Sequence, residues 1–248
     1  MDFVFEDRTI TINIANMAAL LDEVRRRFRA GTGFALATIN LDHLAKMAKS
    51  PDFVRAYCAQ DLVVADGNPI VALSRLAHKP VGLVPGADMI LPLCQLAGEE
   101  RVKLALVGST NIALQDAATA LRALVANLDI ALCIAPSGQF DPDGDEAAAI
   151  LTQLDKADIQ LCFLALGAPK QELLAVRGRK LSPKTGFASI GAGLDFLGGH
   201  QHRAPMWMRK LAIEWLWRAL SSPRRLIPRY ARCFAILPRQ TLAALRQR

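Results

Sequence analysis

The sequence predicts an α/β protein with a Rossmann-like, mostly parallel sheet, helices on both of its faces, and a basic helical C-terminal appendage. Short apolar runs alternate with helical patterns along most of the 248 residues. These runs are continuously apolar, which is typical of strands that are buried on both faces. The appendage is predicted from the stretch 203–230, which holds all three tryptophans among arginines and lysines, with Glu214 as its only acid.

Six apolar runs are expected to form the strands of the sheet. Between them the pattern favours helices: Ser50 followed by Pro51 is a typical helix start, and GDEAAAILTQL places acids in a first helical turn. The first dozen residues suggest a small hairpin. The expected strands are 34–40, 62–66, 103–108, 129–136, 158–167 and 187–193, and the expected helices include 50–60, 68–77, 111–126, 169–180 and one that opens at 144.

The net charge of +7 is unevenly distributed. Between 203 and 248 there are eleven basic residues and one acid, a local charge of +10, which leaves 19 basic and 22 acidic residues before that stretch. The body is therefore mildly acidic and the basicity belongs to the C-terminal part. An apolar share of 52% is enough for a sizeable core and argues against disorder.

Cysteine usage and the N-terminus point to a cytoplasmic protein. The five cysteines are odd in number, widely spaced and never in a C-x-x-C pair, so neither a disulfide framework nor a zinc cluster is expected. MDFVFEDRTITI carries acids where a signal peptide carries bases. No uncharged apolar run reaches the roughly 18 residues that span a bilayer.

Ligands of open parallel sheets bind beyond the carboxyl ends of the strands, so the residues that follow each predicted strand are candidates for a site. Asp66 ends an apolar strand, and Gly67 lets the backbone turn away and a ligand approach. We expect the Asp66 carboxylate to act as a general base, with helix capping as the alternative role for this motif and for TINLDHL. The candidate binding residues at these ends are Thr38, Asn40, Gly67, Asn68, Gly108, Lys170 and Gln171.

The stretch LGAPKQE opens a predicted helix with glycine and then proline at its first position, which suits a phosphate, and Lys170 and Gln171 can reach the same anion or a sugar hydroxyl. Other nucleotide and hydrolase motifs are missing: there is no P-loop, no G-x-G-x-x-G fingerprint in register and no G-x-S-x-G. A metal site is not expected, because His200 and His202 lack clear partners and DPDGD is more typical of a turn and cap.

Several motifs together resemble the WecG/TagA/CpsF family of bacterial glycosyltransferases between about 38 and 229. These are TINLDHL, VVADGNPIV, PGADM, DIQLCFLALGAPKQE, GAGLDFLGG and RAPMWMRKLAIEWLWRAL. The resemblance implies an inverting enzyme with a Rossmann-like core that moves a sugar from a UDP-sugar to a sugar on undecaprenyl diphosphate, in cell-surface polysaccharide biosynthesis. The transferred sugar is commonly N-acetylmannosamine or its uronic acid and sometimes glucose. It also implies a C-terminal appendage that approaches the inner face of the membrane and completes the active site.

Site residues follow from this resemblance. Asp66 matches the proposed base, Thr38 and Asn40 match residues that line the nucleotide-sugar pocket, and Gln171 matches the glutamine of the P-K-Q-E motif. The appendage arginines thought to meet the diphosphate correspond to Arg218, Arg225 and Arg229. One departure leaves the donor sugar open, because Leu83 and Pro85 in LVPGAD stand where relatives commonly have arginine and threonine.

The expected mechanism is a single displacement in which Asp66 takes the proton of the acceptor hydroxyl and cationic or N–H groups stabilise the leaving UDP without a metal. The appendage combines tryptophan with arginine, a composition that suits the interface of a bilayer. For Trp207 and Trp215, packing of the appendage onto the core is the alternative. Pro223 and Pro228 are expected to break or kink the helical run, with 237–248 as a last short helix.

The expected domains are a UDP-sugar-binding body, 1–199, and a membrane-associating appendage, 200–248. The expected partners are the UDP-sugar, the polyprenyl-diphosphate acceptor and the inner leaflet of the plasma membrane, with no nucleic acid and with self-association away from the membrane. The alternative function is a non-catalytic nucleotide- or nucleic-acid-binding module on the same fold.

Overall fold

The computed structural model of the chain describes residues 1–197, 199, 208 and 214–248. Its centre is a six-stranded sheet with the strand order β4-β3-β8-β7-β5-β6, in which every pair of neighbours is parallel. The strands are β3 (Phe34–Ile39), β4 (Leu62–Ala65), β5 (Lys103–Gly108), β6 (Asp129–Ile134), β7 (Leu161–Ala165) and β8 (Gly186–Ser189). The predicted Rossmann-like parallel sheet is confirmed.

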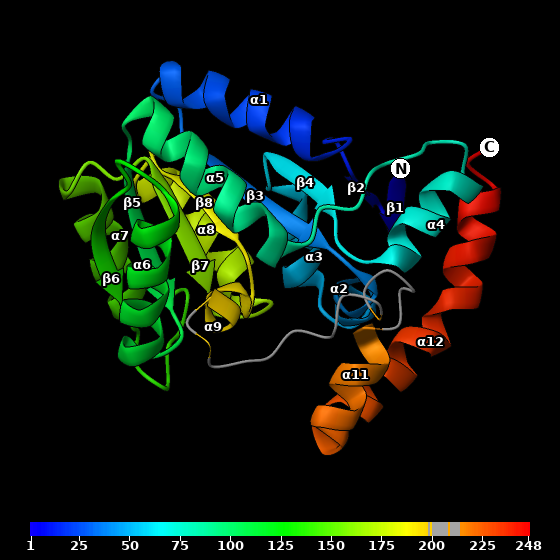
Figure 1. Ribbon diagram of the computed structural model, residues 1–248. Helices are drawn as coiled ribbons and strands as arrows, with labels where there is room; N and C mark the ends of the chain where they lie inside the picture. The colour runs from blue at the N-terminus through cyan, green and yellow to red at the C-terminus, as the bar shows by residue number, and fades with distance from the viewer. Residues whose placement is uncertain (198, 200–207, 209–213) are drawn as a thin grey trace.

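Helices cover both faces of this sheet (Figure 1). In β3, Phe34 and Leu36 pack into a core cluster with helices of one face, whereas Ala37 and Ile39 pack into a second cluster on the other face, since successive side chains of a strand point to opposite sides. The first layer contains α1 (Met17–Arg29), α5 (Gly86–Glu100), α6 (Asn111–Leu124) and α9 (Gly193–Leu197). The second contains α2 (Leu41–Met47), α3 (Pro51–Cys58), α4 (Asn68–Leu76), α7 (Asp145–Lys156) and α8 (Lys170–Leu181).

The order of the strands places a topological switch point at the centre of the sheet. From β3 the chain moves to β4 at one edge, and from β5 it moves to β6 at the other edge. Strands β8 and β7 fill the space between these two halves. The carboxyl ends of β4, β3, β8, β7 and β5 therefore form one continuous edge, which is where ligands of such sheets bind.

Local signals explain most element boundaries, and two expectations need correction. Ser50 caps α3 through a bond from the Phe53 N–H and Pro51 occupies its first turn, as predicted. Pro169, however, stands at the cap position before α8 instead of inside its first turn. The last strand ends at Ser189, because Gly191 has a φ of +58° that no strand accommodates, and the glycine run after it turns into α9.

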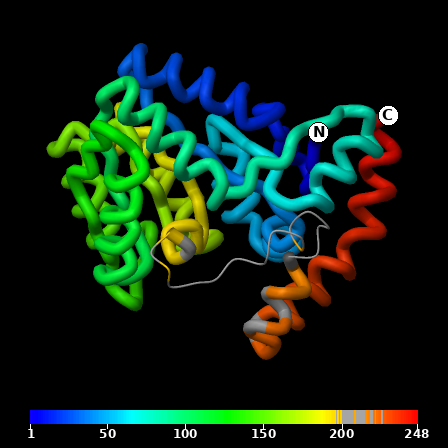
Figure 2. Tube along the Cα trace, viewed as in Figure 1, coloured from blue at the N-terminus to red at the C-terminus, as the bar shows by residue number. Residues whose placement is uncertain are grey.

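The N-terminal hairpin is confirmed as β1 (Asp2–Phe5) paired antiparallel with β2 (Arg8–Thr11). The C-terminal part contains α11 (Glu214–Ser221) and α12 (Pro223–Leu245). Helix α12 lies against α2 and α4 and ends beside the hairpin, so that the two termini are close together (Figure 2). There the Gln247 side chain accepts from the Asp2 N–H at 3.1 Å and donates to the Asp2 carbonyl at 2.6 Å.

Pro223 separates the two C-terminal helices, as predicted, but the expected separate helix over 237–248 is wrong. Helix α12 continues through Pro228 and Pro238. Each proline removes one hydrogen bond of the helix, and the buried contacts of Cys233 and Ala244 with the second core cluster hold the helix in place. Half of the appendage thus shares a core with the body. The division at 199/200 stays a prediction, since residue 200 lies outside the described residues.

Candidate active site

Asp66 and Asn40 meet at the carboxyl edge of the sheet. The Asp66 N–H donates to the Ile39 carbonyl at 2.8 Å, which extends the pairing of β4 with β3 by one residue. Asn40 follows β3 and caps α2, because its Oδ1 accepts from the His43 N–H at 3.0 Å. Its Nδ2 donates to Asp66 Oδ2 at 3.2 Å. A single amide therefore both starts a helix, as the capping alternative expected, and orients the candidate base.

The chain turns away directly after Asp66. Gly67 has a φ of +103° and is the cap residue of α4. A Cβ at this position would have only the Pro69 ring within 4 Å, at 3.7 Å, so the backbone conformation, not a lack of space, requires glycine. Asp66 itself is half-buried and Asn68 is exposed. The Asp66 carboxylate consequently stands at the rim of the sheet with access from solvent.

Beneath this rim lies an uncharged polar cluster around the Thr38 carbonyl. Tyr57 donates its hydroxyl to that carbonyl at 2.7 Å, and His43 Nδ1 lies 2.8 Å from the same oxygen and 2.6 Å from the hydroxyl. Burial lowers the pKa of His43 to about 4 and raises that of Tyr57 well above its ordinary value. Both groups are neutral near pH 7, so this cluster supports the edge without adding charge. Thr38 itself is buried.

Gln171 is turned into the protein. The sequence expected its amide to reach a phosphate or sugar hydroxyl, but the side chain is buried, with Oε1 accepting from the Gly191 N–H at 3.1 Å and Nε2 donating to Glu172 at 2.8 Å. Lys170, by contrast, is half-exposed at the start of α8 and makes no ion pair with any residue in the described part of the chain. Of the two, Lys170 is the one available to an anion.

Gly108 has a structural reason to be glycine. Its φ is +119°, and a Cβ would lie 2.4 Å from the Ala165 carbonyl oxygen on the neighbouring strand. The close approach of β5 and β7 thus accounts for this residue without a ligand. The next residue, Ser109, donates its hydroxyl to Asp195 of α9 at 2.6 Å and so ties this end of the edge to the turn after β8.

Nearly the whole chain matches a known protein family. Residues 8–248 match the model of the glycosyl transferase WecG/TagA/CpsF family. The chain belongs to this family. One similar protein is the N-acetylglucosaminyldiphosphoundecaprenol N-acetyl-beta-D-mannosaminyltransferase of Bacillus subtilis strain 168, which is 25% identical over 224 residues, covering 88% of this chain and 85% of the relative. The resemblance carried by APKQE and the C-terminal motif is confirmed, and with it the expectation of an enzyme.

In this WecG/TagA/CpsF transferase, Arg229 of α12 forms an ion pair with Asp42 of α2. Its Nε lies 3.2 Å from Asp42 Oδ2, and Lys46 Nζ lies 3.1 Å from the same oxygen. Lys46 also donates to the Ala168 carbonyl at 3.2 Å, in the loop before α8. Arg229 therefore links α12 to the helix that Asn40 caps, and its expected contact with a diphosphate stays a prediction. Arg218 and Arg225 lie on α11 and α12, and their side chains are outside the described part, as are Trp207, His200 and His202.

The departure from the family pattern lies next to the candidate base. The Val84 N–H donates to the Ala65 carbonyl at 2.8 Å, so the segment that carries Leu83 and Pro85 is attached to the strand that ends at Asp66. Leu83 is 41% exposed. An exposed apolar side chain thus stands beside the candidate site, at the position where the family resemblance predicted an arginine.

A cavity of about 280 Å³ lies on the C-terminal side of α2. Its lining combines apolar groups with Lys46, Lys49 and Arg232, and Asp66 is not part of it. Within the described residues, no group of three or more histidine, cysteine or acidic side chains is arranged to hold a metal ion. Over the same residues, no helix is both long and apolar enough to cross a membrane.

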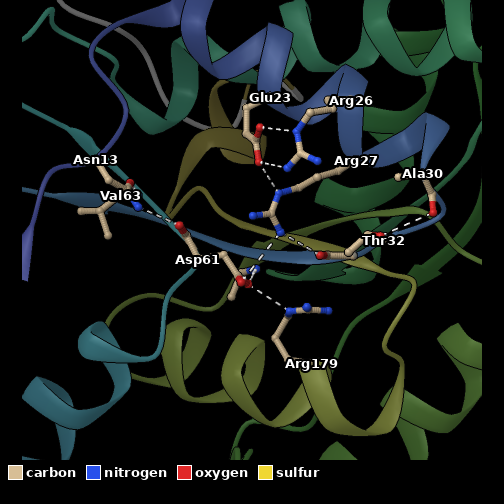
Figure 3. Close-up of polar contacts among 11 residues, drawn as sticks. Asn13, Glu23, Arg26, Arg27, Ala30, Thr32, Asp61, Val63 and Arg179 are labelled. Carbon is tan, nitrogen blue, oxygen red and sulfur yellow. Dashed lines mark hydrogen bonds and ion pairs between the residues drawn. The ribbon is translucent and has the colours of Figure 1, made fainter.

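The opposite end of the sheet offers a comparison. At the amino end of β4, Asp61 Oδ2 accepts from the Ala35 N–H at 2.8 Å and from Arg179 Nε at 2.9 Å (Figure 3). Arg27 lies between this aspartate and Glu23, to which it donates at 2.7 Å. These charges are satisfied by one another and by the backbone. This cluster fastens α1 and α8 to the sheet, and Asp61 makes a suitable control for Asp66.

The sequence interpretation missed Glu172, although it lies inside the P-K-Q-E motif. Its side chain is completely buried, Oε1 accepts from Gln171, and Oε2 has no hydrogen-bond partner among the described residues. Burial raises the pKa of this carboxyl to about 7. A glutamate in the first turn of a helix is ordinarily solvated and favoured by the helix dipole, so nothing in the local sequence signals its burial.

Proposed function

We propose that this transferase moves a hexose from a UDP-sugar to the saccharide of a polyprenyl-diphosphate lipid, with inversion at the anomeric carbon and Asp66 as the base. The observation that carries the proposal is the position of Asp66. It is a half-exposed carboxylate directly after β4, at the carboxyl edge of the sheet, oriented by Asn40. This arrangement suits a general base.

In the proposed displacement, the acceptor hydroxyl attacks the anomeric carbon while Asp66 takes its proton. The new glycosidic C–O bond forms as the bond from the anomeric carbon to the diphosphate oxygen breaks, and UDP leaves with the electron pair. Negative charge grows on the leaving diphosphate, so donors near it lower the barrier. The half-exposed Lys170 at the start of α8 supports this role, and we propose the same role for Arg218 and Arg225. No step requires a metal.

The nature of the acceptor rests on the family and on the relative. The Bacillus subtilis protein is named for transfer of N-acetylmannosamine to N-acetylglucosaminyl-diphosphoundecaprenol. For this chain we propose the same class of acceptor, a saccharide on a polyprenyl diphosphate. The donor is proposed only as a UDP-hexose, because Leu83 and Pro85 alter the segment beside Asp66.

Attachment to the inner leaflet of the plasma membrane is part of the proposal. Helices α11 and α12 expose the apolar side chains Trp215, Leu216, Leu220, Ile227, Phe234, Leu242 and Leu245. Trp215 packs edge-on against Tyr230 and Phe234 of α12, with ring centroids 5.9 and 5.6 Å apart, and remains 41% exposed. It therefore packs on aromatic neighbours within the appendage itself. Exposed aromatic and basic residues on one element suit an anionic bilayer surface.

The test measures UDP release by the full-length protein with a panel of UDP-sugars and a short polyprenyl-diphosphate-saccharide. Asp66→Asn should reduce acceptor-dependent turnover at least about 100-fold with one donor. The matched control is Asp61→Asn, at the other end of β4, which should change stability and leave kcat nearly unchanged. Equal turnover in Asp66→Asn and the wild type would remove Asp66 from its role, and absence of turnover with every UDP-sugar would refute the donor class.

A further inference from the structure

Glu172 is a buried acid for which the mechanism above has no use. It belongs to the first turn of α8, is 0% exposed, and presents two carboxyl oxygens with different surroundings. Oε1 accepts from Gln171 at 2.8 Å, whereas Oε2 has no partner among the described residues. Burying a carboxyl with an unsatisfied oxygen costs free energy. Such a group persists where another feature of the protein depends on it.

The contacts of Gln171 show what depends on Glu172. A glutamine amide has one accepting oxygen and one donating nitrogen, and its two orientations are nearly equal in shape. Here the oxygen faces the Gly191 N–H and the nitrogen faces the carboxyl. In the reversed orientation, the Gln171 nitrogen would face the Gly191 N–H, which is also a donor. The Gln171 oxygen would then face the Glu172 carboxyl oxygen, which is also an acceptor. The carboxyl can accept at this contact in either protonation state, and it thereby favours the orientation in which Gln171 holds Gly191.

Gly191 is the first glycine of the turn after β8. It has a φ of +58° and leads through a bond from the Gly193 N–H to the Ile190 carbonyl into α9. Strand β8 lies between β3, which ends just before Asn40, and β7, which ends before the α8 loop. The turn therefore forms the centre of the edge that holds Asp66. At its far end it is held by the bond from Ser109 to Asp195.

We propose that Glu172 is a positioning residue for the transfer reaction. Through the Gln171 amide it fixes the Gly191 turn as a wall of the donor site, without touching the substrate. The effect of Glu172 on the reaction rests on the proposed UDP-sugar site. Its effect on the position of the Gly191 turn is independent of that proposal. Because the bond from Asn40 to Asp66 is separate from this chain of contacts, loss of Glu172 should weaken donor binding more than it slows the chemical step.

The test uses two substitutions at Glu172 in the full-length protein. Glu172→Leu cannot accept a hydrogen bond, and Glu172→Gln still can. Hydrogen exchange, followed by mass spectrometry over a peptide spanning 186–197, should show faster exchange at the turn in Glu172→Leu and wild-type protection in Glu172→Gln. The KM for the UDP-sugar should rise about 10-fold or more in Glu172→Leu, with kcat within about 3-fold, and Glu172→Gln should restore both.

The matched control is Ser182→Ala, at the other end of α8, where the buried Ser182 hydroxyl bonds Thr185 at 2.7 Å. It should lower stability without changing the turn or the KM. The proposal is overturned if Glu172→Leu retains wild-type protection, if Glu172→Gln loses as much as Glu172→Leu, or if Ser182→Ala raises the KM equally. If Glu172→Leu does not fold, Gln171→Met takes its place and must expose the same turn. If the wild-type protein does not bind UDP, the proposed UDP-sugar donor is refuted. The hydrogen-exchange data would still show whether Glu172 positions the Gly191 turn.

Discussion

The Glu172→Gln variant is expected to gain stability relative to the wild type as the pH rises from about 4.5 to about 7. In the folded protein the carboxyl is fully buried and one of its oxygens has no partner among the described residues. Burial raises its pKa from 4.5 to about 7, although the bond from Gln171 acts in the opposite direction. Glutamine fills the same volume and does not titrate.

Over this pH interval the unfolded chain has released the proton of Glu172 and the folded chain retains it. The unfolded state then binds fewer protons, so the free energy of unfolding of the wild type falls by about 1.4 kcal/mol per pH unit from this group. Across the interval between the two pKa values this amounts to roughly 3 kcal/mol. The stability of Glu172→Gln minus that of the wild type should rise by this amount and level off above about pH 7.5.

The difference in unfolding free energy between Glu172→Gln and the wild type is more informative than the pH dependence of either protein alone. Burial lowers the pKa of His43 from 6.5 to about 4, and a histidine kept neutral in the fold makes stability rise with pH over that range. In the wild type this gain offsets the loss from Glu172. The charged and titratable groups that influence Glu172, including Lys46 and Tyr57, are present in both proteins. Subtracting one curve from the other removes their contributions.

The assay is urea unfolding followed by tryptophan fluorescence at pH 4.5, 6 and 7.5. Glu146→Gln is the control: bonds from the Ser137 side chain and backbone lower the pKa of Glu146 from its ordinary 4.5. Its contribution to stability is lost only as the pH falls below that value, so the difference between this variant and the wild type should stay nearly flat from pH 4.5 to 7.5. A difference curve for Glu172→Gln that is flat from pH 4.5 to 7.5 would refute the reasoning, because the carboxyl would then ionise as if it were in water.

Three further outcomes are expected. Gly108→Ala should destabilise the protein by more than about 2 kcal/mol in thermal unfolding, because its Cβ meets a backbone carbonyl, whereas Gly138→Ala, which meets nothing within 4 Å, should have little effect. Arg229→Ala and Asp42→Asn should show a coupling of about 1 kcal/mol in a double-mutant cycle, and additive effects would exclude the ion pair as the anchor of α12. Trp215→Ser should reduce flotation with anionic vesicles several-fold and leave kcat on a soluble acceptor unchanged; unchanged flotation would contradict attachment through this face.

Much of the fold could be predicted because the responsible signals are local. Continuous apolar runs, the Ser50–Pro51 start and the glycines after the strands each depend on a few neighbouring residues. All six strands were found, although the last one is shorter than expected. Asp66 could be placed at the edge of a sheet for the same reason. The family resemblance rested on short motifs of this kind and is confirmed over 8–248.

The partners of individual side chains could not be predicted, because they come from segments far apart in the chain. The order of the strands brings Asn40 to Asp66 and the start of α8 to Gly191, and no local pattern encodes that order. For the same reason the sequence did not show that the Gln171 side chain is buried between Gly191 and Glu172.

The sequence by itself determined the fold class, the family and the position of the candidate base, since hydrophobic periodicity and motif spacing are properties of the chain. Only the tertiary structure decided which polar groups are exposed at the carboxyl edge of the sheet and which are buried or paired as supports of the fold. Arg229 and Gln171 are such supports, and the acid beside Gln171 is buried instead of solvated. Burial and pairing depend on how the layers pack, and packing is decided by the whole chain at once.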